Sequence, residues 1–599
     1  MAESSFEAAF EGAPAARAHS SPSPGVLLFL RGQDADGRVR ENLTRRLALR
    51  PWLGVLAIAL IERRSYEPLG FRSLADYARE RLGISARGLR EQARVWNALA
   101  ALPQLRDAVL GGEVSYSVAR RTVALVPPEH DGAATAALRG RTARAADVIA
   151  DALRAADRNA SRADVDTAPP QAASELVSLR LHVSAETAVR WHAGLELARA
   201  MAGEALPAWE ATEAMAAEAL GALPSSLVRE ASDRLARSEP AAGEKAPPPV
   251  GRRPSSEHGI RHQAFPLLRW SAISANRSVA SHDPDALLAR ARSASPHALD
   301  AALRRVVRAR QEIDHDLGHL LRQILDRRLY CELGFPSFDR YVIERADLSP
   351  RTARRRVRLA RLGPPTSVLA HAFRSGALDE ARALAVGAAA ASPVGESAAA
   401  DASRLGGQAG GTREALLADV ASWVAFARTH TLRRVEDERS RRVAGRPVIA
   451  FRAPPEAVAV IELALEAARL DLAASVTSAP SLANAFRWIV EHAIACWEEQ
   501  GAAFDDYADF TRDGFRCTTP ACSARRNLQS HHIVFRSQGG TDDPGNRTTL
   551  CAFHHLRGIH ARTVSCRGHA PETLEFALGI RAEGPPLLRV RSGDRILAG

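Results

Sequence analysis

The sequence predicts a mainly α-helical protein of several domains, in which a helical unit and a β-α-α module each occur twice and a small ββα metal finger follows. Three observations lead to this prediction: a length of 599 residues, a long internal repeat, and a dense group of cysteines and histidines near the C-terminus. At typical domain sizes a chain of this length holds several domains. Hydrophobic residues make up 46% of it, which is ample for folded cores.

The internal repeat relates residues 61–96 to residues 325–360 at a constant offset of 264 and without gaps. The matches include Leu-Gly-Phe at 69–71 and 333–335, and Glu-Arg at 80–81 and 344–345. Ungapped agreement over this length indicates that a helical unit has been duplicated.

Each copy is expected to form a helix, a tight turn and a second helix. The first helix is predicted at Ser73–Leu82 and Ser337–Ala346, and Ser85 and Ser349 are suitable N-caps for the second. The layout resembles a helix-turn-helix unit, whose second helix can lie in the DNA major groove; the alternative is an arginine-rich helix that only faces solvent. The second helices carry arginines on one face, namely Arg87, Arg90 and Arg94 in the first copy and Arg351, Arg354 and Arg358 in the second.

A shorter shared module follows each copy. Leu176–Val183 and Pro447–Ala453 are predicted strands, each leading into a helix that begins near Ser184 or Pro454. These two segments match at an offset of 270, so we expect the same β-α-α module twice.

These features divide the chain. Residues 236–263 are rich in Pro, Gly, Ser and charged residues, a composition typical of linkers. The expected order is a disordered tail (1–24), helical repeat 1 (25–160), β-α-α module 1 (170–235), the linker (236–285), helical repeat 2 (286–400), a connection (401–445), β-α-α module 2 (446–500) and the C-terminal finger domain (505–599).

Composition limits the compartment and the partners. The N-terminus lacks the pattern of a secretion signal, and the longest apolar run, Trp52–Ile61, is too short to span a bilayer. We therefore expect a soluble, cytoplasmic protein without a membrane partner. The formal net charge of +11 suits nucleic acid as a partner. The alternative for any one arginine is that it only lies on a solvated surface.

The stretch from Cys517 to His560 holds three of the six cysteines and five of the nineteen histidines. Six cysteines are too few for a disulfide scaffold, so this density indicates metal binding in a reducing compartment. A strand is predicted at Leu528–Phe535, a loop at Ser537–Asn546 and a helix at Arg547–Leu556.

This stretch resembles the HNH endonuclease family, through His532, Asn546 and His555 framed by Cys-x4-Cys and Cys-x2-His pairs. The resemblance implies metal-assisted hydrolysis of DNA phosphodiester bonds. It implies that His532 is the general base, that Asn546 orients it, and that His555 completes the catalytic set.

The resemblance also implies two metal sites. A catalytic divalent cation, Mg²⁺ or a similar ion, would be held by His531, His555 and His560. Arg536 and Arg547 are the expected DNA contacts near this site. A structural Zn²⁺ would be held by Cys517, Cys522, Cys551 and His554.

His560 departs from the family pattern, because residues five apart on an α-helix lie about 140° apart. We expect Gly558 to end the helix, so that His560 folds back toward the metal.

Three alternatives stay open at this stage. The chain is a DNA-binding regulator with a zinc-stabilised finger, an RNA nuclease, or a protein whose finger is purely structural, including an inactive nuclease.

Overall fold

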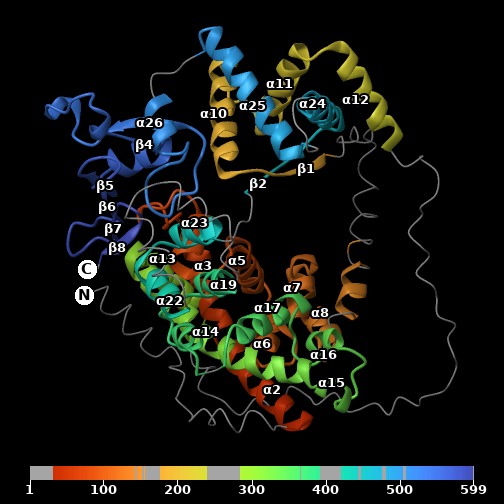
Figure 1. The fold of residues 1–599 in the computed structure, drawn as a ribbon. Helices are drawn as coiled ribbons and strands as arrows, with labels where there is room; N and C mark the ends of the chain where they lie inside the picture. The colour runs from red at the N-terminus through yellow and green to blue at the C-terminus, as the bar shows by residue number, and fades with distance from the viewer. Residues whose placement is uncertain are drawn as a thin grey trace.

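The computed structural model describes residues 31–141, 145–151, 154, 176–238, 284–364, 366–391, 420–442, 447–474, 480–502 and 507–597. Within them the protein is mainly helical, with three small antiparallel sheets. The predicted N-terminal tail, most of the linker and the first part of the connection lie outside the described residues. The helical repeats form one body, and the β-α-α modules and C-terminal sheets form two further groups of elements (Figure 1).

The two repeats contain matching sets of helices. The first has α2 (Gly32–Ala48), α3 (Arg50–Glu62), α4 (Leu74–Leu82), α5 (Ala86–Ala100), α6 (Pro103–Leu110), α7 (Tyr116–Thr122) and α8 (Asp131–Leu138). The second has α13 (Pro284–Ser293), α14 (Pro296–Asp326), α15 (Leu329–Glu332), α16 (Phe338–Glu344), α17 (Pro350–Arg361), α18 (Val368–Arg374) and α19 (Glu380–Ala390).

The predicted helix starts in the repeats are confirmed. The hydroxyl of Ser85 accepts a hydrogen bond from the backbone N–H of Gly88, and that of Ser349 accepts one from Thr352. These hydroxyls satisfy backbone donors that have no partner within the first turn.

The two repeats exchange their first helices. Residues 49–146 share a hydrophobic core with residues 287–313 of the second repeat. In return, Ala35, Val39 and Leu43 of α2 pack into the core formed by residues 317–357. The repeats are therefore interleaved, although they follow one another along the chain.

Two equivalent tyrosine–aspartate contacts link each exchanged helix to the other repeat. The hydroxyl of Tyr77 donates to Asp300 (3.1 Å), and that of Tyr341 donates to Asp36 (3.2 Å). The arginine four residues after each tyrosine forms an ion pair with the same aspartate. Because Asp36 and Asp300 are equivalent at the repeat offset, the contacts relate the two repeats by an approximate two-fold axis.

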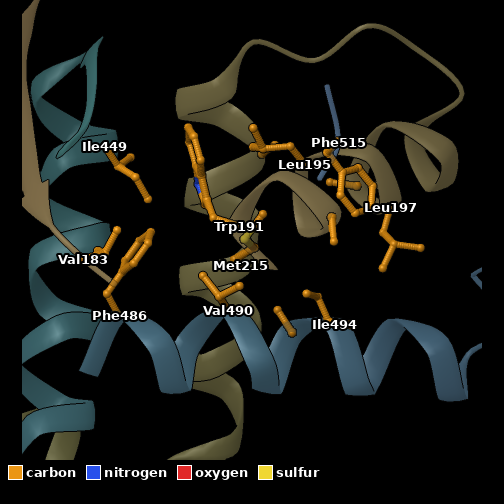
Figure 2. Close-up of a cluster of buried hydrophobic side chains, with 14 of the residues drawn as sticks. Val183, Trp191, Leu195, Leu197, Met215, Ile449, Phe486, Val490, Ile494 and Phe515 are labelled. Carbon is orange, nitrogen blue, oxygen red and sulfur yellow. The ribbon is translucent and has the colours of Figure 1, made fainter. Parts of the chain in front are cut away.

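The predicted strands of the β-α-α modules are also confirmed, and they pair with each other. Strand β1 (Val177–His182) lies antiparallel to β2 (Val448–Ala453) in one two-stranded sheet. The apolar side chains of this region form one core, which Phe515 of the C-terminal domain joins (Figure 2). Its helices are α10 (Ala185–Ala202), α11 (Ala208–Ala222), α12 (Ser225–Ser238), α24 (Pro455–Ala473) and α25 (Leu482–Glu499).

The C-terminal domain contains a hairpin, a helical turn and a sheet. Helices α22 (Val420–Thr429), α23 (Leu432–Arg442) and α26 (Tyr507–Arg512) precede β3 (Leu528–His532), β4 (Arg547–Cys551) and the π-helix η7 (Phe553–Ile559). After this segment β5 (Val564–Arg567) and β6 (Glu575–Leu578) form a hairpin, and β7 (Leu588–Arg591) and β8 (Arg595–Leu597) extend it to four strands.

The prediction of a helix at Arg547–Leu556 is wrong for its first half, because residues 547–551 form β4. Thr548 and Thr549 are β-branched and buried, and they pair with His531 and Ser530 of β3. Cross-strand pairing therefore determines the structure here, and the helical turn begins only at Phe553.

Among the described residues, none of the helices is both long and apolar enough to cross a membrane.

Candidate metal-binding site

Three cysteines and one histidine meet in the C-terminal domain, as the sequence predicted. The ligand atoms of Cys517, Cys522, Cys551 and His554 all lie within 4.8 Å of one another, and all four residues are buried. Within the described part of the chain, this is the one such group of His, Cys, Asp or Glu. A Cys3His set is a common tetrahedral ligand set for structural zinc, so these residues fit a metal ion.

The mutual hydrogen bonds of the cysteines shift their pKa values in opposite directions, with that of Cys517 lowered and that of Cys522 raised. Burial raises the pKa of Cys517, but hydrogen bonds from Cys522 and Cys551 and the charge of His554 outweigh it and bring that pKa well below its usual value. A thiolate is the form of cysteine that binds zinc.

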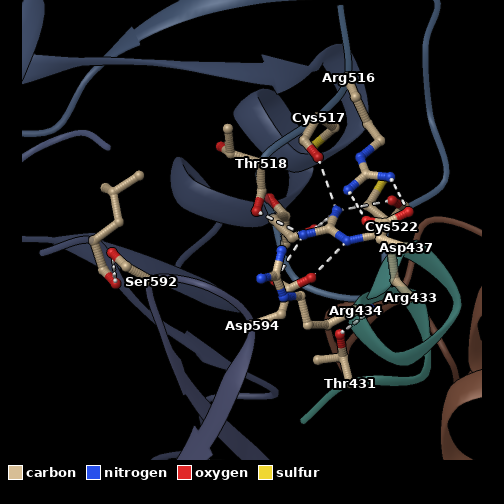
Figure 3. A network of polar contacts seen from close by, with 12 residues as sticks. Thr431, Arg433, Arg434, Asp437, Arg516, Cys517, Thr518, Cys522, Ser592 and Asp594 are labelled. Carbon is tan, nitrogen blue, oxygen red and sulfur yellow. Dashed lines mark hydrogen bonds and ion pairs between the residues drawn. The ribbon is translucent and has the colours of Figure 1, made fainter. Parts of the chain in front are cut away.

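Arg433 of α23 braces the segment that carries the first two cysteines (Figure 3). Its Nη1 donates to the carbonyls of Cys517, Thr519 and Cys522, each at 3.1 Å. Its Nε and Nη2 bind both carboxylate oxygens of Asp594, each at 2.7 Å. One buried guanidinium thus connects α23, the cysteine segment and the last strands.

The same group docks onto the first helical repeat. The Nδ1 of His554 faces Cys517 and Cys551, and its Nε2 lies 3.1 Å from the carbonyl oxygen of Gly70. The hydroxyl of Ser523 also donates to Asp76 of α4 (2.7 Å). A metal at Nδ1 leaves the proton on Nε2, where it can be donated to Gly70.

Three other imidazoles gather beside the hairpin. The ring centroids of His531 and His555 are 5.0 Å apart, as are those of His555 and His560. Burial, followed by the neighbouring histidines, lowers the pKa of His531 to about 4. Burial and His560 lower the pKa of His555 in the same way. Both rings are therefore neutral at pH 7, the form that binds metals.

The π-helix explains how His560 reaches this group. The backbone N–H of His560 donates to the carbonyl of His555, five residues earlier, at 3.2 Å. A turn closed between residues five apart brings them onto one face, unlike an α-helical turn. The expectation that Gly558 ends the helix is wrong, because Gly558 is buried within η7.

His531 and His532 face opposite sides of β3, as adjacent strand residues do. His531 is 2% exposed, whereas the His532 side chain is 20% exposed. The Nε2 of His532 lies 2.8 Å from Oδ1 of Asp542, which Arg536 also binds at 2.5 Å. Nε of Arg536 also donates toward this nitrogen at 3.3 Å, which suits the tautomer with its proton on Nδ1. In the other tautomer Nε2 donates its proton to Asp542, and Nδ1 is left as an acceptor.

The contacts of Asn546 are with the backbone. Its amide bonds to the backbone of the loop before β4 rather than to His532: Oδ1 accepts from the N–H of Val534 (2.8 Å), and Nδ2 donates to the carbonyls of Val534 and Thr541. A Cβ on Gly540 would lie 1.8 Å from the Val534 oxygen, so only glycine fits. Asn546 thus holds the loop that carries Asp542.

Sequence reasoning missed three residues of this site. Asp542 was treated only as part of a polar loop, and Gln529, whose Oε1 lies 2.8 Å from Nδ1 of His555, carried no signal. Phe535 stacks on His560, with ring centroids 5.7 Å apart. Two signals were available in the sequence. Asp542 lies in the loop that follows His532, and Phe535 is an aromatic residue at the end of the predicted strand.

Both arginines predicted to contact DNA near the hairpin have acidic partners within the protein. Arg536 is exposed and pairs with the exposed Asp542 at 2.5 Å, whereas Arg547 pairs with the buried Asp509 at 3.3 Å. The six arginines predicted on the second helices are all exposed. Two of them have partners within the protein: Arg94 donates to the carbonyl of Arg120, and Arg354 pairs with Asp339.

Comparisons of the chain with models of protein families, with curated proteins and with solved structures found no match. The functional argument therefore rests on the residues and their geometry.

Proposed function

We propose that this protein is a metal-dependent endonuclease of the HNH type that hydrolyses DNA phosphodiester bonds. The observation that carries the proposal is the placement of a partly exposed histidine, His532, on the opposite face of β3 from a cluster of three imidazoles. Hydrolysis of a phosphodiester requires a base for water and a positive charge near the phosphate. The hairpin and η7 supply groups for both.

In the proposed mechanism His532 accepts the proton of the attacking water at Nδ1. Asp542 accepts a hydrogen bond from Nε2, which sets the tautomer and stabilises the positive charge that the ring acquires. Asn546 keeps Asp542 in place by holding the loop, and Arg536 is exposed where it can contact phosphate.

The catalytic ion would be held by His531 and His555, with His560 as a third ligand. When bound, a divalent ion stabilises charge on the scissile phosphate and on the leaving oxygen. Because all three candidate ligands are imidazole nitrogens, the set suits transition metals better than Mg²⁺, which prefers oxygen. We expect Mn²⁺ or Co²⁺ to support cleavage at lower concentrations than Mg²⁺.

The Cys3His group is assigned a structural Zn²⁺ in this proposal. Elemental analysis of the purified protein should find zinc, and Cys551→Ser should lower the zinc content. This test needs no nucleic acid.

A plasmid-nicking assay tests the enzyme proposal. The full-length protein is incubated with supercoiled DNA in a series of divalent ions, beside His532→Ala and a control, His182→Ala, on the exposed face of β1. We expect metal-dependent nicking that falls at least about 100-fold in His532→Ala, since general-base catalysis typically contributes this much, and that is unchanged in His182→Ala.

Other outcomes identify the alternatives. DNA binding without nicking in any metal ion supports a DNA-binding regulator, and the exposed arginines of α5 and α17 are the feature that favours it. Faster cleavage of an RNA substrate than of DNA supports an RNA nuclease.

A further inference from the structure

A second basic site lies away from the histidines. A cavity of about 490 Å³ opens between α4, α14, α19 and α22, and Leu588 of β7 and Ile596 of β8 form part of its wall. In Figure 1, α14 and α22 lie beside the C-terminal strands, and α22 contacts β8. The cavity is lined by six arginines: Arg81, Arg304, Arg305, Arg308, Arg382 and Arg428.

Two of these arginines are neutralised within the protein. Arg382 forms ion pairs with Glu80 and Asp379, and Arg81 forms one with Asp300. These pairs use both acidic residues of the cavity wall.

The other four arginines are exposed, and none of them forms an ion pair among the described residues. Arg308 donates to a carbonyl oxygen, that of Ser375. Partial desolvation of its guanidinium and the charge of Arg81 lower the pKa of Arg304, although nearby Asp300 acts in the opposite direction. The cavity therefore has an excess of positive charge that the folded chain does not balance.

The positive surface continues along α14. A second hollow of about 410 Å³ shares Arg305 and Arg308 with the first and adds Arg374, which is itself paired with Glu312 (4.0 Å) and Asp316 (3.7 Å). The α14 residues that line the two hollows recur at three- and four-residue intervals from Ala301 to Glu312, so they occupy one helix face roughly 16 Å long. We call this surface, formed by Arg304, Arg305, Arg308, Arg374 and Arg428, the α14 groove.

The duplication provides an internal comparison for the α14 groove. At the repeat offset, Arg304 corresponds to Arg40, which is paired with Asp36 at 3.0 Å. Arg305 corresponds to a glutamate, Glu41, and Arg308 to a threonine, Thr44. The unbalanced charge thus exists only in the half that faces the C-terminal sheet, so the shared repeat fold does not explain it.

We propose that the α14 groove binds the sugar–phosphate backbone of DNA. Guanidinium groups match phosphate oxygens through paired donors, and an open groove with arginines spaced along a helix suits an extended polyanion better than a compact phosphate. The choice of DNA as the polyanion rests on the proposed nuclease function. The groove would hold the duplex through contacts that do not depend on base sequence.

Direct binding to DNA tests this proposal without cleavage. Full-length His532→Ala, purified with its zinc, is titrated into a labelled duplex of about 20 base pairs, roughly two helical turns, and followed by fluorescence anisotropy. The groove variant adds Arg304→Gln, Arg305→Gln and Arg428→Gln. The matched control adds Arg190→Gln, Arg229→Gln and Arg237→Gln, which remove the same charge from exposed positions of the first β-α-α module.

The salt dependence gives the expected result. Each lost phosphate contact lowers the slope of log K against log salt by about 0.9. We expect the slope of the groove variant to fall by about 2–3 and its affinity to fall at least about 10-fold, with little change in the control. If the groove triple does not fold, as judged by circular dichroism, the single Arg428→Gln variant should still lower the slope by about 1.

Several results would overturn the proposal. They are equal losses in the groove and control variants, no loss in either, or inorganic phosphate that competes at concentrations similar to the duplex. Equal binding of RNA of the same length would overturn the assignment to DNA. Nicking by the wild-type protein is scored separately, so a chain that binds through the groove but cuts nothing refutes only the nuclease.

Discussion

Gly70 offers the sharpest test of how the C-terminal domain sits on the first repeat, because the duplication supplies its control. Gly70 and Gly334 occupy the same turn in the two repeats and have nearly the same φ, +84° and +82°. A Cβ on Gly334 would meet nothing within 4 Å. A Cβ on Gly70 would lie 2.9 Å from Cβ of Leu578 and 3.2 Å from the backbone nitrogen of Gly579.

These distances set the expected magnitudes. A left-handed conformation costs an alanine about 1–2 kcal/mol at either position. Only Gly70→Ala also inserts a methyl group into a close contact with β6, which adds about 1–3 kcal/mol. We therefore expect Gly334→Ala to destabilise by about 1–2 kcal/mol and Gly70→Ala by more, with the excess confined to the docked C-terminal domain.

Hydrogen exchange of the full-length variants measures this excess where it arises. Gly70→Ala should speed exchange in β5 and β6 and in the segment around His554, whose ring meets the Gly70 carbonyl. Gly334→Ala should leave those segments unchanged. Equal effects of the two variants on the C-terminal domain would refute the docking that the structure shows.

Three further predictions follow from buried polar groups. Arg433→Ala removes the donor to four backbone carbonyls and the ion-pair partner of Asp594, so we expect a loss of about 3–5 kcal/mol and of bound zinc, whereas Arg434→Ala on the same helix should cost far less; urea denaturation with elemental analysis compares them. Asp36→Asn and Asp300→Asn each break a tyrosine hydrogen bond and an arginine ion pair between the repeats and should each cost about 3 kcal/mol. Asp36→Asn should cost somewhat more, because Asp36 also pairs with Arg40; a clearly larger shift for Asp300→Asn in thermal denaturation would contradict this reasoning. The pKa of His192 is lowered to about 3 by burial and then by nearby arginines, so the fold favours the neutral ring. Its contribution is complete above the unfolded pKa near 6.5 and is lost as pH falls toward 3, by up to roughly 1.4 kcal/mol per pH unit; a His192→Gln variant should lack this part of the slope in denaturation curves.

Local patterns predicted much of the fold correctly. Ser85 and Ser349 are N-caps in the structure because the capping hydroxyl acts within three residues, a range that sequence reading covers. The two predicted strands of the β-α-α modules are also confirmed, because short strands are likewise predicted from residues close together in the sequence. The helix predicted from Arg547 failed because its first residues pair with a strand across a loop, a contact that local propensity does not contain.

In the candidate site, too, some features could be predicted from the sequence and others could not. The four ligands of the Cys3His group follow from residue type and spacing, since few other roles account for such a set. The reach of His560 does not, because a five-residue spacing is unfavourable on an α-helix and only the π-helical turn brings the rings together. Likewise Asn546 holds the loop between β3 and β4 through backbone groups, which every residue type has, so the sequence carries no pattern that predicts these contacts.

By itself the sequence determined the duplication, the helix starts and strands of each unit, and the four residues of the Cys3His group, because these depend on residue type over short distances. Only the tertiary structure decided that the repeats exchange helices, that His554 docks on Gly70, and that unpaired arginines of α14 form a groove beside the C-terminal sheet. Those features join residues hundreds of positions apart, and whether a charge is balanced depends on which acid folds next to it.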